Sequence, residues 1–346
     1  MDIKIGENIL KELDYYLKGK EINKLYIITD ENVNRLYMDY LKEQVKDYDL
    51  ITYILKPGEE SKSIDTILSI YDDLIKNNID RNTIIISFGG GVVGDIAGFV
   101  AATYKRGLKY IQIPTTLLAQ VDSSVGGKVG IDYRGFKNII GSFYFPETTI
   151  IHIGFLKTLP LREITCGLGE ILKYGLIYDY SLFQYITSYI DNIYSKDLTN
   201  LLPIVKKSIA IKEEIVDKDR YDTGMRKILN FGHTIGHSIE TYYDFTKYNH
   251  GEAVILGMVY ESYIAKEMEL IKDRYFQEVF SSLRKLIPLI RFSQREIEDL
   301  IDIMKNDKKN IDDNIGFVLP IEKGEVDLFY NIDEKLIVKS LKGEWI

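Results

Sequence analysis

The sequence predicts an α/β protein in which a domain built on a parallel sheet is followed by a mainly helical domain. Three observations predict this arrangement. Short apolar runs alternate with segments of helical periodicity in the first third of the chain, one such run stops in a series of glycines, and helical periodicity dominates beyond residue 160. Because 346 residues can build more than one hydrophobic core, we expect two domains, residues 1–160 and 161–346.

The first third of the chain has the order strand, helix, strand. KLYIITD (24–30) is a continuous apolar run that ends in an acid, as strands buried on both faces often read. IDTILSIYDDLIK (64–76) has apolar residues at helical spacing, and NTIIISFGGG (82–91) is a β-branched run that ends in glycines. This order is typical of a Rossmann-like parallel sheet covered by helices, which binds ligands at the carboxyl ends of its strands.

The remainder of the chain divides into a strand-rich and a helical part. Short strands and turns are expected between residues 110 and 155, in YIQIPTT, SSVGGKVGIDYRGFKN and TTIIHIG. After TLPLRE (158–163) we expect amphipathic helices near residues 164–178, 199–217, 226–243, 252–269 and 294–306, and a late strand at GFVLP (316–320). A site is expected in the cleft between the α/β half and the helical half.

Composition and charge restrict the class of protein. No stretch approaches the roughly 20 apolar residues that cross a bilayer, and the N-terminus has no apolar segment of a signal peptide. The single cysteine, Cys166, excludes an internal disulfide, is expected to be a small buried apolar residue, and fits a reducing, cytoplasmic location. The net charge of −8 argues against a non-specific nucleic-acid binder but is compatible with a small anionic ligand.

FGGGVVGDIAGF (88–99) follows a strand and opens a helix, so its backbone N–H groups can approach a phosphate. Its spacing is neither G-x-G-x-x-G nor that of a Walker A loop, and a turn needed only for packing is the alternative. Asp30 ends the preceding strand, where an acid would hydrogen-bond a ribose hydroxyl. Because this acid precedes the glycines, the pattern indicates a dinucleotide bound in a variant of the Rossmann manner.

Several basic residues run against the negative net charge. Each alone is most simply a surface cation, but together they would suit a substrate that carries phosphate and carboxylate. They are Arg106, Lys128 and Lys137 in glycine-bearing loops with the neighbouring Asn138, Lys173 three residues beyond Glu170, Lys212, Arg226 with Asn230 one helical turn later, and Lys308 and Lys309.

Three of the four histidines lie between residues 233 and 250. His233 and His237 are four apart and would share one face of a helix, and His250 follows in HGEAV. The stretch HTIGH lacks the glutamate of an H-E-x-x-H metalloprotease. Imidazole and carboxylate suit zinc, and the candidate ligands are these three histidines with Glu170, Glu240 and Glu252; spacing alone does not choose among them, and packed core histidines are the alternative.

At this point the sequence resembles the 3-dehydroquinate synthase family of the sugar-phosphate cyclase group. The resemblance runs in order from about residue 57 to residue 309. The matching stretches are PGEESK, GGGVVGDIAGFVAATYKRG, IPTTLLAQVDSSVGGKVGID, GFKNIIGSFYFP, LKTLPLREITCGLGEILKYG, LNFGHTIGHSIE, HGEAV and DKK.

The resemblance implies two cofactors and their ligands. Glu170, His233 and His250 would hold one divalent metal ion, zinc or cobalt, while His237 would contact the substrate or handle a proton. NAD would be bound by Asp30, Glu59, Lys62, Gly91, Val92, Val93, Gly94, Asp95, Thr115, Thr116, Lys128, Lys137, Phe155 and Thr158.

The resemblance also implies a substrate site and a homodimer. The substrate would be bound by Arg106, Asp122, Lys128, Asn138, Lys173, Lys212, Arg226, Asn230, His237 and Lys308 or Lys309. Within this set we assign the phosphate to Lys128, Asn138, Arg226 and His237, and the carboxylate and hydroxyls to Lys173, Lys212 and Lys308 or Lys309. In the family the counterpart of Arg106 reaches in from a neighbouring subunit.

One loop departs from the family pattern. Where the family usually reads D-E-x-E-x-G-x-R, this chain has DRYDTGMR at residues 219–226. A substrate-contacting glutamate is therefore replaced by the shorter Asp222, and an acid is replaced by Arg220. Asp222 would still reach the substrate through a water molecule or a small backbone shift.

The activity implied by the resemblance is the conversion of 3-deoxy-D-arabino-heptulosonate 7-phosphate to 3-dehydroquinate and phosphate, in the shikimate pathway to chorismate and the aromatic amino acids. It would proceed by transient oxidation with NAD, phosphate elimination, re-reduction, ring opening and intramolecular aldol closure, which makes the enzyme a carbon–oxygen lyase. The alternatives are a related cyclase acting on sedoheptulose 7-phosphate or glucose 6-phosphate, a metal-dependent polyol dehydrogenase, and a non-catalytic relative on the same fold.

Overall fold

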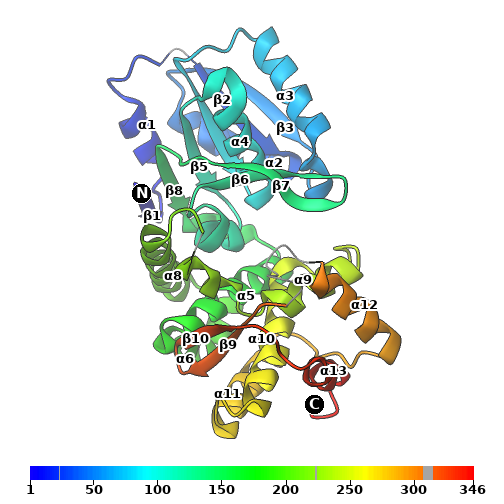
Figure 1. Ribbon diagram of the computed structural model, residues 1–346. Helices are drawn as coiled ribbons and strands as arrows, with labels where there is room; N and C mark the ends of the chain where they lie inside the picture. The colour runs from blue at the N-terminus through cyan, green and yellow to red at the C-terminus, as the bar shows by residue number, and fades with distance from the viewer. Residues whose placement is uncertain (23, 223, 307–314) are drawn as a thin grey trace. The chain divides into compact units, whose positions relative to one another are not determined.

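The computed structural model describes residues 1–22, 24–222, 224–306 and 315–346 (Figure 1). It contains two compact units. The first comprises Met1–Pro160 together with Lys196–Glu213, and the second comprises Leu161–Ser195 together with Glu214–Ile346. The first unit thus includes a segment from beyond residue 160, and the domain limits expected from the sequence stay a prediction.

A six-stranded sheet forms the centre of the first unit (Figure 1). The strands run in the order β1-β8-β5-β4-β2-β3, and every neighbouring pair is parallel. Their bounds are β1 Ile3–Gly6, β2 Lys24–Asp30, β3 Asp49–Leu55, β4 Thr83–Gly89, β5 Tyr110–Pro114 and β8 Thr148–His152. The predicted parallel sheet is confirmed.

Both faces of this sheet are buried, which explains why β2 and β4 are continuous apolar runs. Successive side chains of a strand point to opposite faces, so Ile85 joins one core cluster while Ile84 and Ile86 join the other. Helices α3 (Ile64–Lys76) and α4 (Gly91–Thr103) cover the first face. Helices α1 (Lys11–Leu17) and α2 (Glu31–Gln44) cover the second face.

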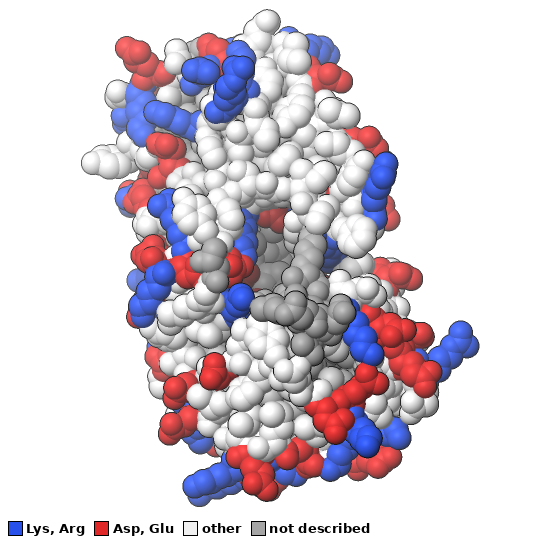
Figure 2. All heavy atoms as spheres, in the orientation of Figure 1, with Lys and Arg blue, Asp and Glu red and all other residues white. Residues whose placement is uncertain are grey.

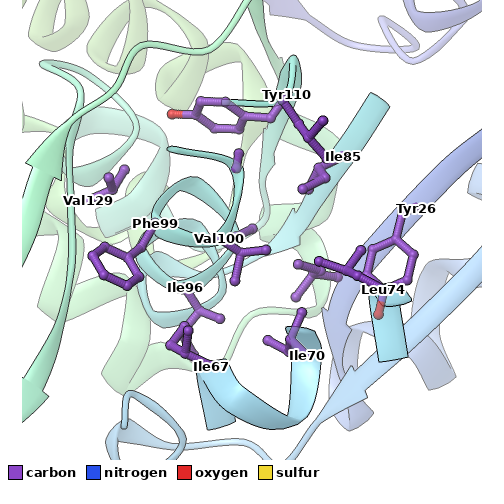
Figure 3. Packing of buried hydrophobic residues seen from close by; sticks show 14 of the residues in the cluster. Tyr26, Ile67, Ile70, Leu74, Ile85, Ile96, Phe99, Val100, Tyr110 and Val129 are labelled. Atoms are coloured by element: carbon purple, nitrogen blue, oxygen red, sulfur yellow. The ribbon is translucent and has the colours of Figure 1, made fainter. Parts of the chain in front are cut away.

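Figure 3 shows the first of these clusters from close by. Side chains of α3 and α4 meet side chains of the sheet and of the strand Lys128–Tyr133, and the buried residues of the cluster are all less than one tenth exposed. The labelled residues are Tyr26, Ile67, Ile70, Leu74, Ile85, Ile96, Phe99, Val100, Tyr110 and Val129. Burial of one such isoleucine or phenylalanine contributes about 1.5–3 kcal/mol to folding, so this packing fixes α4 and its glycine-rich start against the sheet.

The strand order reverses between β2 and β4. From β2 the chain continues outward to β3, whereas from β4 it continues in the opposite direction to β5. Thr29 of β2 pairs with Phe88 of β4, so Asp30 and the glycines after Phe88 lie at neighbouring carboxyl ends. Such a reversal is where open α/β sheets bind ligands.

Shorter elements complete the first unit. Strands β6 (Lys128–Tyr133) and β7 (Phe136–Phe143) form an antiparallel hairpin, as expected from the turn-rich sequence. The unit also has a π-helical turn at Ala119–Ser123, the first part of α8 (Leu198–Lys218), and 3-10 helices at Glu59–Ser61, Tyr104–Arg106 and Ile153–Thr158.

The second unit is mainly helical, as predicted. Its helices are α5 Leu161–Ile177, α6 Tyr180–Ser188, α7 Ile190–Tyr194, the end of α8, α9 His233–Tyr242, α10 His250–Glu267, α11 Asp273–Leu283, α12 Gln294–Lys305 and α13 Glu334–Lys342. Strands β9 (Phe317–Glu322) and β10 (Glu325–Phe329) pair as an antiparallel hairpin, of which the sequence predicted only the first.

The continuous helix predicted over residues 226–243 is wrong. Met225–Asn230 forms a 3-10 helix, and α9 begins only at His233. The break falls at Gly232, whose φ of +78° lies in the left-handed region that favours glycine. A Cβ there would lie 2.5 Å from the side chain of Met258. The interruption therefore makes His233 the first residue of a helix.

The C-terminus is held by an aromatic cluster. The single tryptophan, Trp345, stacks on Tyr263 with ring centroids 4.3 Å apart and an interplanar angle of 10°. Its ring also meets Phe276 edge-on at 5.5 Å, and its Nε1–H donates to the carbonyl of Ser340 at 3.0 Å. These contacts, all within the second unit, fix the last residues against α10, α11 and α13.

Basic and acidic side chains are interspersed over the face drawn in Figure 2. The net charge of −8 is therefore not collected on this face into a single acidic field. Among the described residues, no helix is both long enough and apolar enough to span a lipid bilayer.

Candidate active site

Glycines bring three helices of the second unit into close contact. A Cβ on Gly251 of α10 would lie 1.9 Å from the carbonyl oxygen of Cys166 in α5. A Cβ on Gly257 would lie 1.9 Å from the carbonyl oxygen of Gly232, which immediately precedes α9. No larger residue fits at either crossing, so glycine permits α5 and α9 to approach the backbone of α10. Figure 1 labels the three helices.

These crossings bring a carboxylate and two imidazoles together. Glu170 lies in α5, His233 is the first residue of α9, and His250 is the first residue of α10. The Oε1 atom of Glu170 is 3.3 Å from Nε2 of His233 and 3.2 Å from Nε2 of His250. The three donor atoms all lie within 4.8 Å of one another.

The other nitrogen of each ring faces a hydrogen-bond acceptor. Nδ1 of His233 is 3.0 Å from the carbonyl oxygen of Phe231, and Nδ1 of His250 is 3.1 Å from Oε2 of Glu240. A neutral imidazole carries one N–H, and these acceptors favour the proton on Nδ1. With a metal bound, both Nε2 atoms would then present a lone pair to the ion, the arrangement that metal-binding histidines usually have.

The donor set fits a divalent metal ion. Zinc binds histidine nitrogen at about 2.0–2.1 Å and carboxylate oxygen at about 2.0–2.2 Å, which places tetrahedral ligands about 3.3–3.5 Å apart. The separations of 3.2 and 3.3 Å from Glu170 are close to this value. Three protein ligands with an open position are typical of catalytic zinc.

Lys173 stabilises the carboxylate of this group. Its ammonium forms an ion pair with Oε2 of Glu170, on the side opposite the histidines, and both side chains are almost fully buried. Burial raises the pKa of Glu170, but Lys173 and the two histidines outweigh it and hold the pKa well below its usual range. Glu170 is therefore ionised at neutral pH, as a metal ligand must be.

The two histidines differ in their pKa. Burial, together with the nearby ammonium of Lys173, lowers the pKa of His233 to about 4. Burial also lowers the pKa of His250, but the carboxylates of Glu240 and Glu170 outweigh it and raise this pKa to about 10 in the metal-free protein. His233 is thus a ready ligand, whereas His250 releases a proton when a metal binds.

The start of α10, which carries His250, is fixed by its own hydrogen bonds. Asn249 and Glu252 form a capping box in which each side chain bonds the backbone N–H of the other. Arg162 then donates to both oxygens of Glu252, at 2.9 and 2.7 Å. Glu252, one of the candidate ligands from the sequence, thus serves the helix cap and belongs to neither three-donor group of the described residues.

In the first unit, most of the residues expected to bind a dinucleotide follow the carboxyl ends of five parallel strands, whereas Lys128 and Lys137 belong to the hairpin of β6 and β7. The residues that follow the five strands therefore lie along one edge of the sheet. Asp30 ends β2, Glu59 and Lys62 follow β3, Gly91, Val92, Val93, Gly94 and Asp95 follow β4, Thr115 and Thr116 follow β5, and Phe155 and Thr158 follow β8.

The glycine run is built closely into this edge. Gly90 is the N-cap residue of α4 and has no side chain that could accept a hydrogen bond from the first N–H groups of the helix. A Cβ on Gly90 would be 3.1 Å from Thr116, and one on Gly91 would be 3.2 Å from Ser123. Asp30, at the neighbouring strand end, accepts from the backbone N–H groups of Asn32 and Val33 through Oδ1. The helix start with its uncapped N–H groups suits a phosphate.

Lys62, whose side chain is buried, is the centre of a polar cluster at the same edge. Its ammonium is 2.6 Å from Oδ2 of Asp95 and 3.8 Å from Oε1 of Glu59, and it also donates to Oδ1 of Asn138. Burial lowers the pKa of Lys62, but the carboxylates of Asp95 and Glu59 outweigh this and raise it. Lys62 thus joins three expected site residues, which lie in the 3-10 helix after β3, in α4 and in β7.

Two other expected NAD-binding residues, Phe155 and Thr158, contact Tyr37 of α2. The ring of Phe155 is buried in the core and lies 5.7 Å from Phe88 and 4.6 Å from Tyr37, measured between ring centroids. The hydroxyl of Thr158 hydrogen-bonds the hydroxyl of Tyr37. Because the ring of Phe155 is buried, this residue can reach a dinucleotide through its backbone only.

The expected substrate-binding residues of the first unit have varied surroundings. Nζ of Lys212 is 2.6 Å from Oδ1 and 2.5 Å from the backbone oxygen of Asp122, which joins two residues expected to share the site. Lys128 and Arg106 are exposed, and Lys137, which is expected at the NAD site and not at the substrate site, is half-buried. Arg106 has a φ of +63°, in the left-handed region.

Three expected substrate-binding residues of the second unit precede or enter α9. The side chain of Arg226 is buried. Oδ2 of Asp219 accepts hydrogen bonds from the backbone N–H groups of Arg226 and Gly224. Asn230 is half-buried at the end of the 3-10 helix. The ring of His237 lies 5.0 Å from that of His233 and 5.8 Å from that of His250, measured between centroids. Lys308 and Lys309 fall outside the described residues.

Comparison with known proteins assigns the family. Residues 52–166 match the family 3-dehydroquinate synthase N-terminal, and residues 167–310 match 3-dehydroquinate synthase C-terminal. The chain is 46% identical to the 3-dehydroquinate synthase of Alkaliphilus metalliredigens over 94% of this chain and 90% of that protein. It is 41% identical to the enzyme of Streptococcus pyogenes serotype M18 over 98% and 95%.

Solved structures of related cyclases have the same fold. A 2-deoxy-scyllo-inosose synthase in complex with carbaglucose-6-phosphate, NAD+ and Co2+ is similar with a TM-score of 0.88 and 26% identity, over 98% of this chain and 96% of that one. The 2-epi-5-epi-valiolone synthase of Streptomyces hygroscopicus, with NAD+ and Zn2+ bound, has a TM-score of 0.89 at 24% identity, over 98% and 95%. The chain belongs to the 3-dehydroquinate synthase family.

Proposed function

We propose that the protein converts 3-deoxy-D-arabino-heptulosonate 7-phosphate to 3-dehydroquinate and phosphate, as a carbon–oxygen lyase that depends on NAD and one divalent metal ion. The observation that carries the proposal is the convergence of Glu170, His233 and His250, with Oε1 of the glutamate within 3.3 Å of both Nε2 atoms. Membership of the family supplies the substrate and product.

Each cofactor would have its own set of residues. Glu170, His233 and His250 would hold zinc or cobalt, and the carboxyl edge of the sheet from Asp30 to Thr158 would hold NAD. When bound, the metal would acidify a substrate hydroxyl, and NAD would take up a hydride and return it within one turnover.

The residues of the chain would supply orientation and charge. Lys128, Asn138, Arg226 and His237 would bind the phosphate, because charged donors bind phosphate oxygens strongly. Lys173 and Lys212, with Lys308 or Lys309, would orient the carboxylate and hydroxyls. Both lysines in the described part are held in place by a carboxylate, Glu170 for Lys173 and Asp122 for Lys212. Positioning of this kind lowers the activation free energy, because the substrate loses its translational and rotational freedom on binding and not in the reaction step.

The test is release of inorganic phosphate from the heptulosonate phosphate. The purified protein with NAD and zinc or cobalt should release phosphate, chelator should stop the release, and added metal should restore it. His250→Ala should abolish the restoration, whereas Lys206→Met, an exposed lysine of α8, serves as control. Absence of phosphate release with metal and NAD saturating would refute the proposal.

A cyclase with another sugar phosphate as substrate is the second candidate. It is favoured by Asp222 in place of the family glutamate and by the fold shared with the inosose and valiolone synthases. Turnover compared across the heptulosonate phosphate, sedoheptulose 7-phosphate and glucose 6-phosphate decides between the two. A polyol dehydrogenase would instead accumulate NADH, which a cyclase regenerates to NAD.

We also propose that the protein is a homodimer in which Arg106 acts in the partner's site. Its support is the exposed position of Arg106 in a strained loop where Lys105, Arg106 and Gly107 all have positive φ. Arg106→Ala and His250→Ala should each be inactive alone. Mixed and re-associated, they should regain about a quarter of the wild-type activity, because half of the dimers are mixed and have one complete site. No recovery in verified mixed dimers would contradict action across the interface.

A further inference from the structure

Glu240 is a buried carboxylate that has no part in the proposed reaction. It lies in α9, seven residues after His233 and therefore on the same face of the helix two turns later. Its side chain is only 5% exposed. A buried carboxylate is costly unless charged or polar groups compensate it, so the group that faces Glu240 matters.

The ring of His250 faces Glu240. Oε2 of Glu240 is 3.1 Å from Nδ1 of His250, while Oε1 of Glu170 is 3.2 Å from Nε2 of the same ring. His250 thus lies between two carboxylates, one at each nitrogen. His233 differs, because its Nδ1 faces a neutral backbone carbonyl, that of Phe231, at 3.0 Å.

Two three-donor groups share His250, and they make different demands on its ring. Glu170, His233 and His250 form one group, and His237, Glu240 and His250 form the other. A metal in the first group needs the lone pair of Nε2 and leaves the proton on Nδ1, where Glu240 accepts it. A metal in the second group would need Nδ1 itself, and Glu240 would then be a ligand.

We propose that Glu240 is a positioning residue that holds His250 with its proton on Nδ1 and thereby directs Nε2 into the metal site with Glu170 and His233. The inference rests on the metal site of the proposed function and adds a residue to it. A charged acceptor also increases the electron density on the imidazole, so Glu240 strengthens the bond that His250 makes to the metal. His233, with a neutral acceptor, lacks this effect.

The test measures zinc binding to the metal-free protein without NAD or substrate. The dissociation constant is obtained by competition with a chromophoric chelator for the wild type, Glu240→Gln, Glu240→Ala and Glu170→Gln. Partners of metal-ligating histidines typically contribute 10–100-fold in affinity. We expect Glu240→Gln to weaken binding about 10-fold, because the amide oxygen still accepts from Nδ1, and Glu240→Ala to weaken it up to about 100-fold. Glu170→Gln, which changes a ligand, should weaken binding more than either.

A matched control and a spectroscopic readout separate positioning from packing. Glu163→Gln changes a half-buried carboxylate of α5 that belongs to neither donor group, and it should bind zinc as the wild type does. With cobalt in place of zinc, Glu240→Gln should shift the visible absorption bands but keep their intensity, because the ligands are unchanged. Thermal unfolding of the metal-free variants checks the fold, and the isosteric Glu240→Gln carries the conclusion if Glu240→Ala does not fold.

Two results would overturn the inference. Affinities of both Glu240 variants within twofold of the wild type would show that the carboxylate only packs against the ring. Loss of binding in Glu240→Gln as complete as in Glu170→Gln would make Glu240 a ligand. Phosphate release plays no part in the measurement, so a protein that binds zinc in the expected order but does not turn over substrate would overturn the proposed reaction and leave the role of Glu240 intact.

Discussion

Replacement of Gly251 by alanine tests whether close helix contact assembles the metal site. The added Cβ would lie 1.9 Å from the carbonyl oxygen of Cys166, 2.5 Å from its carbonyl carbon and 2.6 Å from its Cα. All three are backbone atoms, so no side chain can rotate away. Because ordinary contact begins at about 3.4 Å, α5 and α10 must separate by about 1.5 Å at this point.

The separation acts on the site directly, because Gly251 is the residue after His250 and Cys166 is one helical turn before Glu170. If the helices move as rigid bodies, the distance between Glu170 Oε1 and His250 Nε2 rises from 3.2 Å toward about 4.7 Å. Zinc ligands lie about 3.3–3.5 Å apart. We therefore expect zinc affinity to fall more than 100-fold, and overpacking to lower the free energy of unfolding by about 1–3 kcal/mol.

The assays are zinc competition and thermal unfolding of the metal-free protein. Gly6→Ala is the matched control, because its nearest contact would be Ile9 at 3.8 Å, and it should leave zinc affinity unchanged. If Gly251→Ala bound zinc with wild-type affinity and unfolded at the wild-type temperature, close packing of α5 and α10 would not be what positions Glu170 against His250.

Two further predictions concern the first unit. Lys212→Met removes the cation that pairs with Asp122 at 2.6 Å. It should lower the free energy of unfolding, measured with denaturant, by about 1–3 kcal/mol, and it should abolish phosphate release. Lys206→Met, on the exposed side of α8, should change neither quantity. Burial lowers the pKa of His152 from 6.5. As the pH falls, the unfolded chain therefore takes up the proton before the folded protein does. The stability that His152 contributes is present above about pH 6.5 and is lost as the pH falls. The free energy of unfolding of His152→Phe, measured in urea, should therefore change less with pH between about 7 and 5 than that of the wild type. If the two free energies change with pH in parallel, His152 is not the group responsible.

The sheet was predictable because its strands are buried on both faces. KLYIITD and TIIISFG are mostly apolar, and both end in residues that apolar packing does not require, Asp30 and the glycines after Phe88. Strand β3, DLITYIL, was missed because it is an edge strand whose side chains are mostly half-buried. The edge strand β1 is short and likewise half-buried along its length.

Helical periodicity did not reveal the break at Gly232. Residues on both sides of it are buried, so the apolar pattern of residues 226–243 continues through a point where the backbone turns. The signal available was the glycine itself, before a histidine, but glycine within a helical pattern is tolerated often enough to give no certain boundary. The close approach of Gly232 to Gly257 depends on packing against α10, which no local pattern shows.

The candidate ligands were predictable as a set but not as a choice. Spacing named three histidines and three glutamates, and only the resemblance selected Glu170, His233 and His250. Glu170 faces Nε2 of both His233 and His250. Glu240 instead faces Nδ1 of His250, and Glu252 faces Arg162. Such differences arise where distant segments meet, as do the pairs of Lys62 with Asp95 and Lys212 with Asp122.

The stacking of Trp345 on Tyr263 has a practical consequence. Because the chain has one tryptophan and that residue belongs to the second unit, selective excitation of indole fluorescence reports on this unit alone. Far-ultraviolet circular dichroism reports on both units together. Denaturation followed by the two signals would therefore reveal whether the metal-binding half melts separately from the sheet, and whether added zinc stabilises only the half that emits.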